Sequence, residues 1–216
     1  MIKVTDAGNG ALIRRNKVND DLHRPTNEPH KKDFEIFRPY SVQGEGPSTQ
    51  PSKNGQVMNP ATRSALAHHE AGHAVVDVAG GLVVDGVVVS DQECRTDVVG
   101  LGYLEGEQLP GDEYRRRIEP YLIGQLAGGI AERRHTGLAT DSGDDDRQNA
   151  AWLATKIVPE SESLQHYLER MALAAEIAVT SSWLAIKAVA SRLCEADQLT
   201  REELEEVIGS AVQART

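Results

Sequence analysis

The sequence predicts a mainly α-helical domain with a small β-sheet or hairpin, preceded by a disordered N-terminal arm. Six of the nine prolines lie within residues 1–60, where charged and small polar residues are mixed without sustained periodicity. From residue 59 onward, most segments carry helix start and stop signals. Two valine-rich runs, at 83–90 and 98–104, instead have the composition of strands. We therefore divide the chain into an arm, 1–58, and a domain, 59–210.

The first expected helix is marked at both ends. Asn59 can cap it, Pro60 suits its first turn, and Gly80-Gly81 ends it. The two valine-rich runs follow, and after them Gly111-Asp112 opens a second helix that continues to about His135.

Three further helical regions complete the domain. A third helix is expected from about Ser142 to Val158, before Pro159. Residues 160–194 form either one long amphipathic helix or a helical pair. Thr200 with Glu203 three positions later is typical of a capping box at the start of a final helix.

Composition narrows the functional class. A net charge of −10 argues against a nucleic-acid-binding surface, and an aromatic content of 4% argues against base-stacking platforms. No charged segment followed by an apolar one opens the sequence, and acidic residues and glycines interrupt the apolar region 74–89. We therefore expect no secretory signal and no integral membrane segment. The two cysteines are expected to be reduced thiols of a cytoplasmic protein.

The segment His69-Glu70-Ala71-Gly72-His73 lies within the first expected helix. Two histidines four residues apart share one helix face, so both imidazoles can bind a single metal ion. Glu70 can reach the water that the metal activates without being a ligand itself. The pattern predicts a zinc hydrolase with one Zn²⁺ ion per chain and Glu70 as its general base. His68 points about 100° away from His69, so we expect it at the surface or behind the ligands.

A catalytic zinc site needs a third protein ligand. The candidates downstream are Glu132, His135, Asp141, Asp144, Asp145 and Asp146. Asp146 begins a helix stripe that continues through the apolar residues Ala150, Leu153 and Ile157. A carboxylate that faces the core needs a partner, and a metal ion would supply one. The sequence therefore favours Asp146.

The other candidates have alternative explanations. Asp144 and Asp145 lie on more polar faces and complement the helix dipole. His135, beside Thr136-Gly137, suits a helix C-terminus. Glu132 is the main rival, because a glutamate on a downstream helix is the third ligand in some HExxH enzymes. Its other expected role is a salt bridge with Arg133, Arg134 or a neighbouring helix.

Several separated segments resemble the FtsH-type zinc metallopeptidases, in the same order along residues 60–208. The segments are HHEAGHAVV (68–76), VVDGVVVSDQECRTDVVGLGYLEGE (83–107), IGQLAGGIAERRHTG (123–137), TDSGDDDRQNAAWLATKIV (140–158) and LCEADQLTREELEEVI (193–208). The fourth is similar to TTGASNDLxxATxxARxMV, in which the aspartate before the leucine is the third zinc ligand. Alanine spacing aligns that aspartate with Asp146. Glu132 aligns with a family glutamate that is not a ligand.

The chain also departs from this family. The usual member carries an N-terminal membrane anchor and an AAA+ ATPase module, and we expect neither here. No GxxxxGK[ST] phosphate loop occurs in the 216 residues. Asp145 stands where the family has asparagine, and Arg147 stands where it has an apolar residue.

The resemblance implies a stand-alone, FtsH-like zinc endopeptidase that cleaves unfolded or flexible proteins without its own ATPase module. Expected partners are protein or peptide substrates, with a separate ATPase or adaptor and a homo-oligomer left open. The arm is either a docking or targeting tail or an extension with no specific partner. The run 98–104 is expected to pair with an extended substrate as an added strand. The alternative function is a non-catalytic zinc-binding module, regulatory or partner-binding, which has no need of Glu70.

Overall fold

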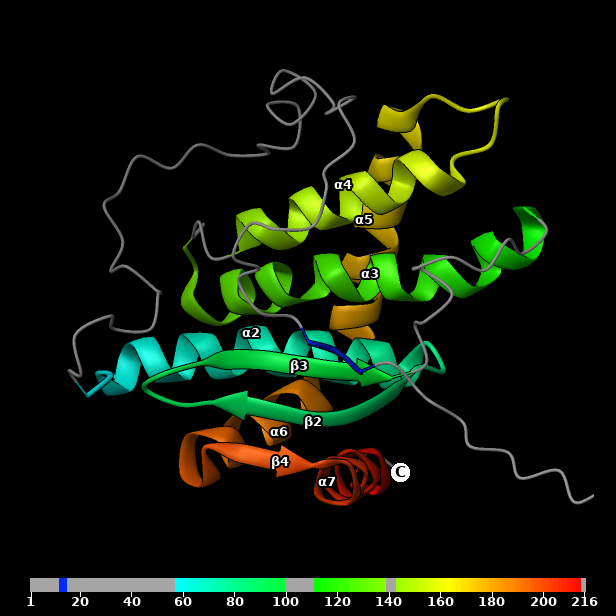
Figure 1. Ribbon diagram of the computed structural model, residues 1–216. Helices are drawn as coiled ribbons and strands as arrows, with labels where there is room; N and C mark the ends of the chain where they lie inside the picture. The colour runs from blue at the N-terminus through cyan, green and yellow to red at the C-terminus, as the bar shows by residue number, and fades with distance from the viewer. Residues whose placement is uncertain (1–11, 15–56, 100–110, 139–142, 215–216) are drawn as a thin grey trace, which may run out of the picture.

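The computed structural model describes residues 12–14, 57–99, 111–138 and 143–214 (Figure 1). Its first helix, α2 (Pro60–Ala79), has the expected ends. The side chain of Asn59 accepts a hydrogen bond from the backbone N–H of Thr62 at 2.9 Å. Gly81, just beyond the C-terminus, has a φ of 82°, a left-handed conformation that glycine adopts without strain.

The expected hairpin is present as β2 (Val83–Val89) and β3 (Cys94–Val99), which pair antiparallel. The second strand begins four residues before the expected run 98–104, because residues 94–97 pair with β2 despite their polar side chains. Two three-residue strands complete a four-stranded sheet in the order β1-β3-β2-β4: β1 (Leu12–Arg14) and β4 (Gln198–Thr200). Neither was predicted, because so short a segment has no periodicity of its own and is defined by its partner. β1 lies within the arm that was expected to be disordered.

Within the described residues, five helices follow the hairpin. They are α3 (Gly111–Thr136), α4 (Asp144–Ile157), α5 (Leu164–Ser181), α6 (Trp183–Ala196) and α7 (Arg201–Gln213). The region 160–194 is therefore a helical pair, and its two helices are bent by 74°. The capping box between Thr200 and Glu203 is present. Across the described part of the chain, no helix alone is long and apolar enough to span a membrane, although α5 and α6 meet that description when taken together.

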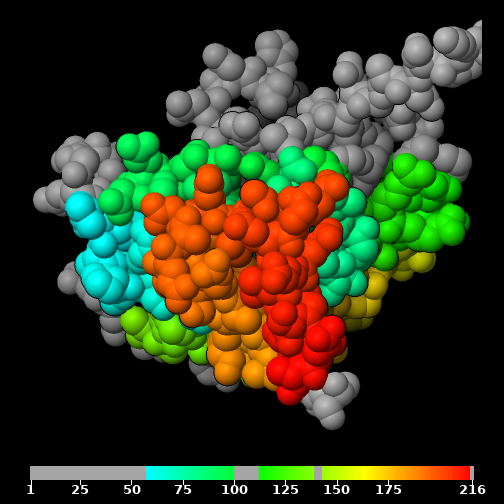
Figure 2. All heavy atoms as spheres, turned by 90° about the horizontal axis from the view of Figure 1, so that it is seen from below, coloured from blue at the N-terminus to red at the C-terminus, as the bar shows by residue number. Residues whose placement is uncertain are grey.

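Helix α2 lies at the centre of the arrangement. It contacts α3, α6, β2 and β3, and α3 in turn contacts α4 and α5 (Figure 1). Helices α6 and α7 form the face seen in Figure 2, next to the hairpin. The helix that carries His69, Glu70 and His73 is therefore enclosed by neighbouring elements.

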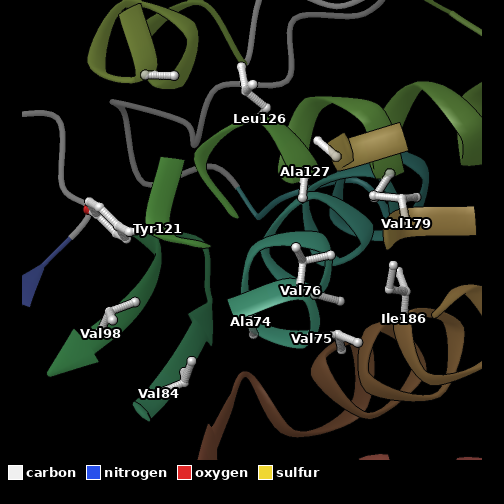
Figure 3. Close-up of a cluster of buried hydrophobic side chains, with 14 of the residues drawn as sticks. Ala74, Val75, Val76, Val84, Val98, Tyr121, Leu126, Ala127, Val179 and Ile186 are labelled. Atoms are coloured by element: carbon white, nitrogen blue, oxygen red, sulfur yellow. The ribbon is translucent and has the colours of Figure 1, made fainter. Parts of the chain in front are cut away.

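The hydrophobic core surrounds α2 (Figure 3). Buried side chains approach it from the sheet and from α3, α5 and α6: Val84, Val98, Leu122, Ala127, Val179 and Ile186. Burial of each valine or isoleucine side chain contributes roughly 1.5–3 kcal/mol, so the position of α2 is strongly determined by packing. Three predicted features lie outside the described residues: residues 100–104, Asp141 and most of the arm.

Candidate metal centre

Two histidines of α2 and one aspartate of α4 bring their donor atoms together. His69 and His73 are buried, with 5% and 1% of their surface exposed, and their Nε2 atoms lie 3.0 Å apart. The Oδ2 atom of Asp146 lies 3.0 Å from Nε2 of His69 and 3.2 Å from Nε2 of His73. One donor atom from each residue can therefore contact a single metal ion.

Asp146 occupies this position because of the stripe on α4. The other members of the stripe are buried: Ala150, Leu153 and Ile157. Asp146 is the half-buried N-terminal end of that face, whereas Asp144 and Asp145 are exposed and Asp144 pairs with Arg147. Among these three aspartates, the structure brings only Asp146 to the histidines.

Both imidazoles are oriented by a hydrogen bond at Nδ1. The backbone carbonyl of Gly124 lies 2.7 Å from Nδ1 of His73, and Oε2 of Glu132 lies 2.9 Å from Nδ1 of His69. A carbonyl and a carboxylate only accept hydrogen bonds, so each Nδ1 carries the proton. In the neutral rings the Nε2 lone pairs therefore face each other and the Asp146 carboxylate. Such a cluster is stabilised by positive charge, from either a proton or a metal ion.

The pKa values of His69 and Asp146 are shifted in the directions that favour a cation at this centre. Burial disfavours the imidazolium form of His69, but Asp146 and Glu132 outweigh it and raise the pKa of His69 to about 10. Burial would likewise raise the pKa of Asp146, but the two histidines hold that pKa well below its ordinary value. The centre thus keeps an ionised carboxylate and attracts a cation.

Glu70 is held by a contact with β3. Only 6% of the residue is exposed, and its Oε2 accepts a hydrogen bond of 2.9 Å from the hydroxyl of Thr96, a fully buried residue. Burial raises the pKa of the Glu70 carboxyl, which makes the ionised form a stronger base than an exposed glutamate. Sequence reasoning missed Thr96, because nothing in its local pattern indicates that its strand lies against Glu70.

The rival ligand Glu132 has a different role. It is fully buried on α3 and contacts the metal-centre histidine through Nδ1, the atom turned away from the donor group. It therefore orients His69 from behind, and this contact is the pairing with a neighbouring helix that was its other expected role. His135 also lies away from the centre, with its Nε2 2.9 Å from the hydroxyl of Ser64.

His68 is buried rather than exposed at the surface. Its ring stacks on that of His135 at a centroid distance of 3.6 Å, and its Nδ1 lies 2.8 Å from the carbonyl oxygen of Ser64. Burial is the main reason that the pKa of His68 is lowered. His68 thus joins α2 to the end of α3 and takes no part in the donor group.

Two glycines allow α2 and α3 to approach closely enough to build the centre. A Cβ atom on Gly72 would lie 2.6 Å from the Cβ of Ala131, which explains this glycine in mid-helix. A Cβ atom on Gly128 would overlap the imidazole of His73. The close crossing leaves space for His73 and lets its Nδ1 reach the α3 backbone.

Comparison with curated proteins finds similarity to the ATP-dependent zinc metalloprotease FtsH. Identity is 30% over 116 residues for the protein of Alkalihalophilus pseudofirmus, 29% over 116 residues for that of Bacillus subtilis and 32% over 117 residues for that of Lactococcus lactis. Each alignment covers 51% of this chain but only 16–17% of the relative. The chain thus spans about one sixth of these relatives' length. No protein-family model matches. The similarity indicates an FtsH-related region in about half of the chain.

Proposed function

We propose that this chain is a zinc-dependent endopeptidase that hydrolyses peptide bonds in unfolded or flexible proteins. His69, His73 and Asp146 would hold the metal, and Glu70 would be the general base. The observation that carries the proposal is the convergence of three donor atoms within 3.2 Å, with the far nitrogen of each imidazole already bonded. The similarity to a zinc metalloprotease agrees with it.

The donor set fits zinc. Two imidazole nitrogens and one carboxylate oxygen leave a fourth position for water, as catalytic zinc sites do. Iron also binds two histidines and a carboxylate in some enzymes. The buried Glu70 beside His69, positioned as a base and not as a ligand, favours a zinc hydrolase.

The proposed reaction uses few groups of the chain. When bound, zinc would polarise the scissile carbonyl and lower the pKa of the attacking water. Glu70 accepts the proton from that water and returns it to the nitrogen of the leaving amine. Its raised pKa suits the first transfer, since it binds the proton more readily than an exposed glutamate would. Thr96 keeps one carboxylate oxygen of Glu70 in place during the exchange.

The proposed substrates are unfolded or flexible polypeptides. We propose that the peptidase unit acts on chains that are already unfolded, or that a separate ATPase or adaptor delivers. An unfolded chain can supply the extended backbone that an edge strand binds.

The variant Glu70→Gln tests the function. It keeps the size and the hydrogen-bond acceptor of the side chain but removes the base, so we expect zinc content near one per chain and cleavage of unfolded casein reduced at least about 100-fold. Metal content is measured by mass spectrometry of the purified protein, which also distinguishes zinc from iron.

The matched control is Glu205→Gln, an exposed glutamate on α7, which should leave both values unchanged. A wild-type protein with stoichiometric zinc and no cleavage of any unfolded substrate would contradict the enzyme and support a zinc-binding module.

A further inference from the structure

The outer edge of β3, on the side away from β2, is occupied by β1 (Figure 1). The pairing is antiparallel and runs from Leu12 opposite Val99 to Arg14 opposite Asp97. β1 comes from the N-terminal part of the chain and is separated from the start of α2 by residues 15–59. The edge of a strand that contacts the central helix is thus covered by a remote segment of the same chain.

The pairing of β1 with β3 ends next to the residue that contacts Glu70, the candidate base. Asp97 is the last residue of β3 that pairs with β1, and Thr96 precedes it in the sequence. The hydroxyl of Thr96 donates a hydrogen bond of 2.9 Å to Oε2 of Glu70. Consecutive Cα atoms are about 3.8 Å apart, so β1 ends within one residue of the strand position that contacts Glu70. A peptide that extends along this edge would run past the general base.

The edge can accept only one strand at a time. An exposed strand edge offers a row of N–H and C=O groups that binds an extended peptide through main-chain hydrogen bonds. β1 uses these groups along 97–99. An extended substrate placed beside Glu70 along β3 would need the same groups, so the two strands compete.

We propose that β1 is an internal competitor for the substrate-binding edge of β3, and that it must leave before an extended polypeptide can bind beside Glu70. The inference rests on the proposed peptidase function. A three-residue strand is weakly held by itself, but its covalent connection to the domain raises its effective concentration above that of a free peptide. β1 pairs with β3, whereas the metal-binding groups lie on α2 and α4.

Peptide binding tests the proposal without requiring catalysis. The full chain with Glu70→Gln is compared with the same chain carrying Leu12→Pro and Ile13→Pro. Neighbouring residues of a strand direct their N–H groups to opposite sides, so this pair of prolines removes at least one backbone donor that faces β3. The probe is a fluorescent peptide of residues 8–18, measured by anisotropy.

We expect the proline pair to bind the probe at least tenfold more tightly than the chain with native β1. The control Thr26→Pro with Asn27→Pro, which leaves the sequence of β1 intact, should bind like the native chain. Equal affinity in all three proteins overturns the proposal. With Glu70 intact, the proline pair should lower KM for casein several-fold and leave kcat unchanged.

A reversible lock provides a second test. Directly opposed residues of antiparallel strands have Cα atoms about 4.5–5.5 Å apart, within the range of a disulfide. The full chain with Leu12→Cys and Val99→Cys should lose probe binding when oxidised and regain it when reduced. Burial raises the pKa of the native Cys94 thiol to about 12, so that thiol should not interfere. Identical probe binding in both redox states contradicts the proposal.

The two proposals fail separately. Tight probe binding by the proline pair, without casein cleavage by any protein with Glu70 intact, supports the competitor and contradicts the peptidase. Casein cleavage with unchanged probe affinity contradicts the competitor alone.

Discussion

Thr96 and Glu132 show how single residues outside the HExxH segment adjust its side chains. Each is fully buried, and each binds one member of the segment: Thr96 holds Glu70, and Glu132 holds His69. They act on different properties, because Thr96 contacts the base whereas Glu132 contacts a donor residue of the metal centre. Their substitution should therefore produce different defects.

Glu132→Ala and Asp146→Ala distinguish a residue that orients a ligand from the ligand itself. Loss of an orienting carboxylate typically lowers metal affinity 10–100-fold. We expect Glu132→Ala to weaken zinc binding by about that factor and Asp146→Ala to abolish stoichiometric binding, as measured by competition with a chelating dye. Tight zinc in Asp146→Ala together with its loss in Glu132→Ala would reverse the assignment of the third ligand.

Thr96→Val should reduce turnover while preserving zinc. The valine keeps the shape of threonine but removes the hydrogen bond to the Glu70 carboxylate, an interaction of about 1.5–3 kcal/mol. We expect kcat to fall about tenfold or more, with KM unchanged. Thr96→Ser, which restores the hydroxyl, should recover most of the loss. Equal defects in the valine and serine variants would point to packing instead.

At the scale of elements, the close crossing of α2 and α3 controls the geometry of the centre. Gly72 and Gly128 allow the two helices to touch, and the carbonyl of Gly124 then reaches Nδ1 of His73. On the opposite side, Arg63 of α2 donates hydrogen bonds to the carbonyl oxygens of Leu193 and Cys194 near the end of α6. Helix α2 is thus held by backbone contacts on both sides as well as by apolar packing.

Gly128→Ala should disturb both stability and metal binding. Its new methyl group would overlap the His73 ring, and overpacking of a core typically costs about 1–3 kcal/mol of unfolding free energy. We expect a loss of that size in urea unfolding, together with weaker zinc binding. Gly209→Ala is the matched control, since its Cβ meets nothing within 4 Å and alanine favours a helix by up to about 1 kcal/mol.

Across the whole molecule, a bound metal would connect α2 with the N-terminus of α4. The residues concerned, His69 and Asp146, are 77 positions apart in the chain. A ligand that binds only the folded protein stabilises it in proportion to the logarithm of its concentration over its Kd. Metal binding and global stability should therefore change together.

Zinc should raise the melting temperature, and this increase should shrink as the pH is lowered. Without metal the pKa of His69 is about 10, so His69 is protonated at neutral pH and zinc must displace that proton. We expect the apparent zinc affinity to fall about tenfold for each unit of pH below 9. Each such unit would reduce the stabilisation of the folded protein by zinc by about 1.4 kcal/mol. Calorimetry with and without EDTA from pH 6 to 9 measures this, and a pH-independent zinc effect would contradict it.

The sequence by itself determined the features that depend on nearby residues. The caps at Asn59 and Thr200, the glycine end of α2 and the inward face of Asp146 all follow from spacings shorter than a few helical turns. Helical periodicity and capping act over such distances, so these features could be predicted without the fold.

Only the tertiary structure decided which distant groups meet. Glu132 binds His69 across 63 residues, and Thr96 binds Glu70 across 26. β1 joins β3 from more than 80 positions away, although its own three residues carry no strand periodicity. These contacts depend on how helices and strands pack, and local sequence patterns contain no signal for that arrangement. The HExxH segment was therefore visible in the sequence, whereas the residues that orient it and the strand beside it were not.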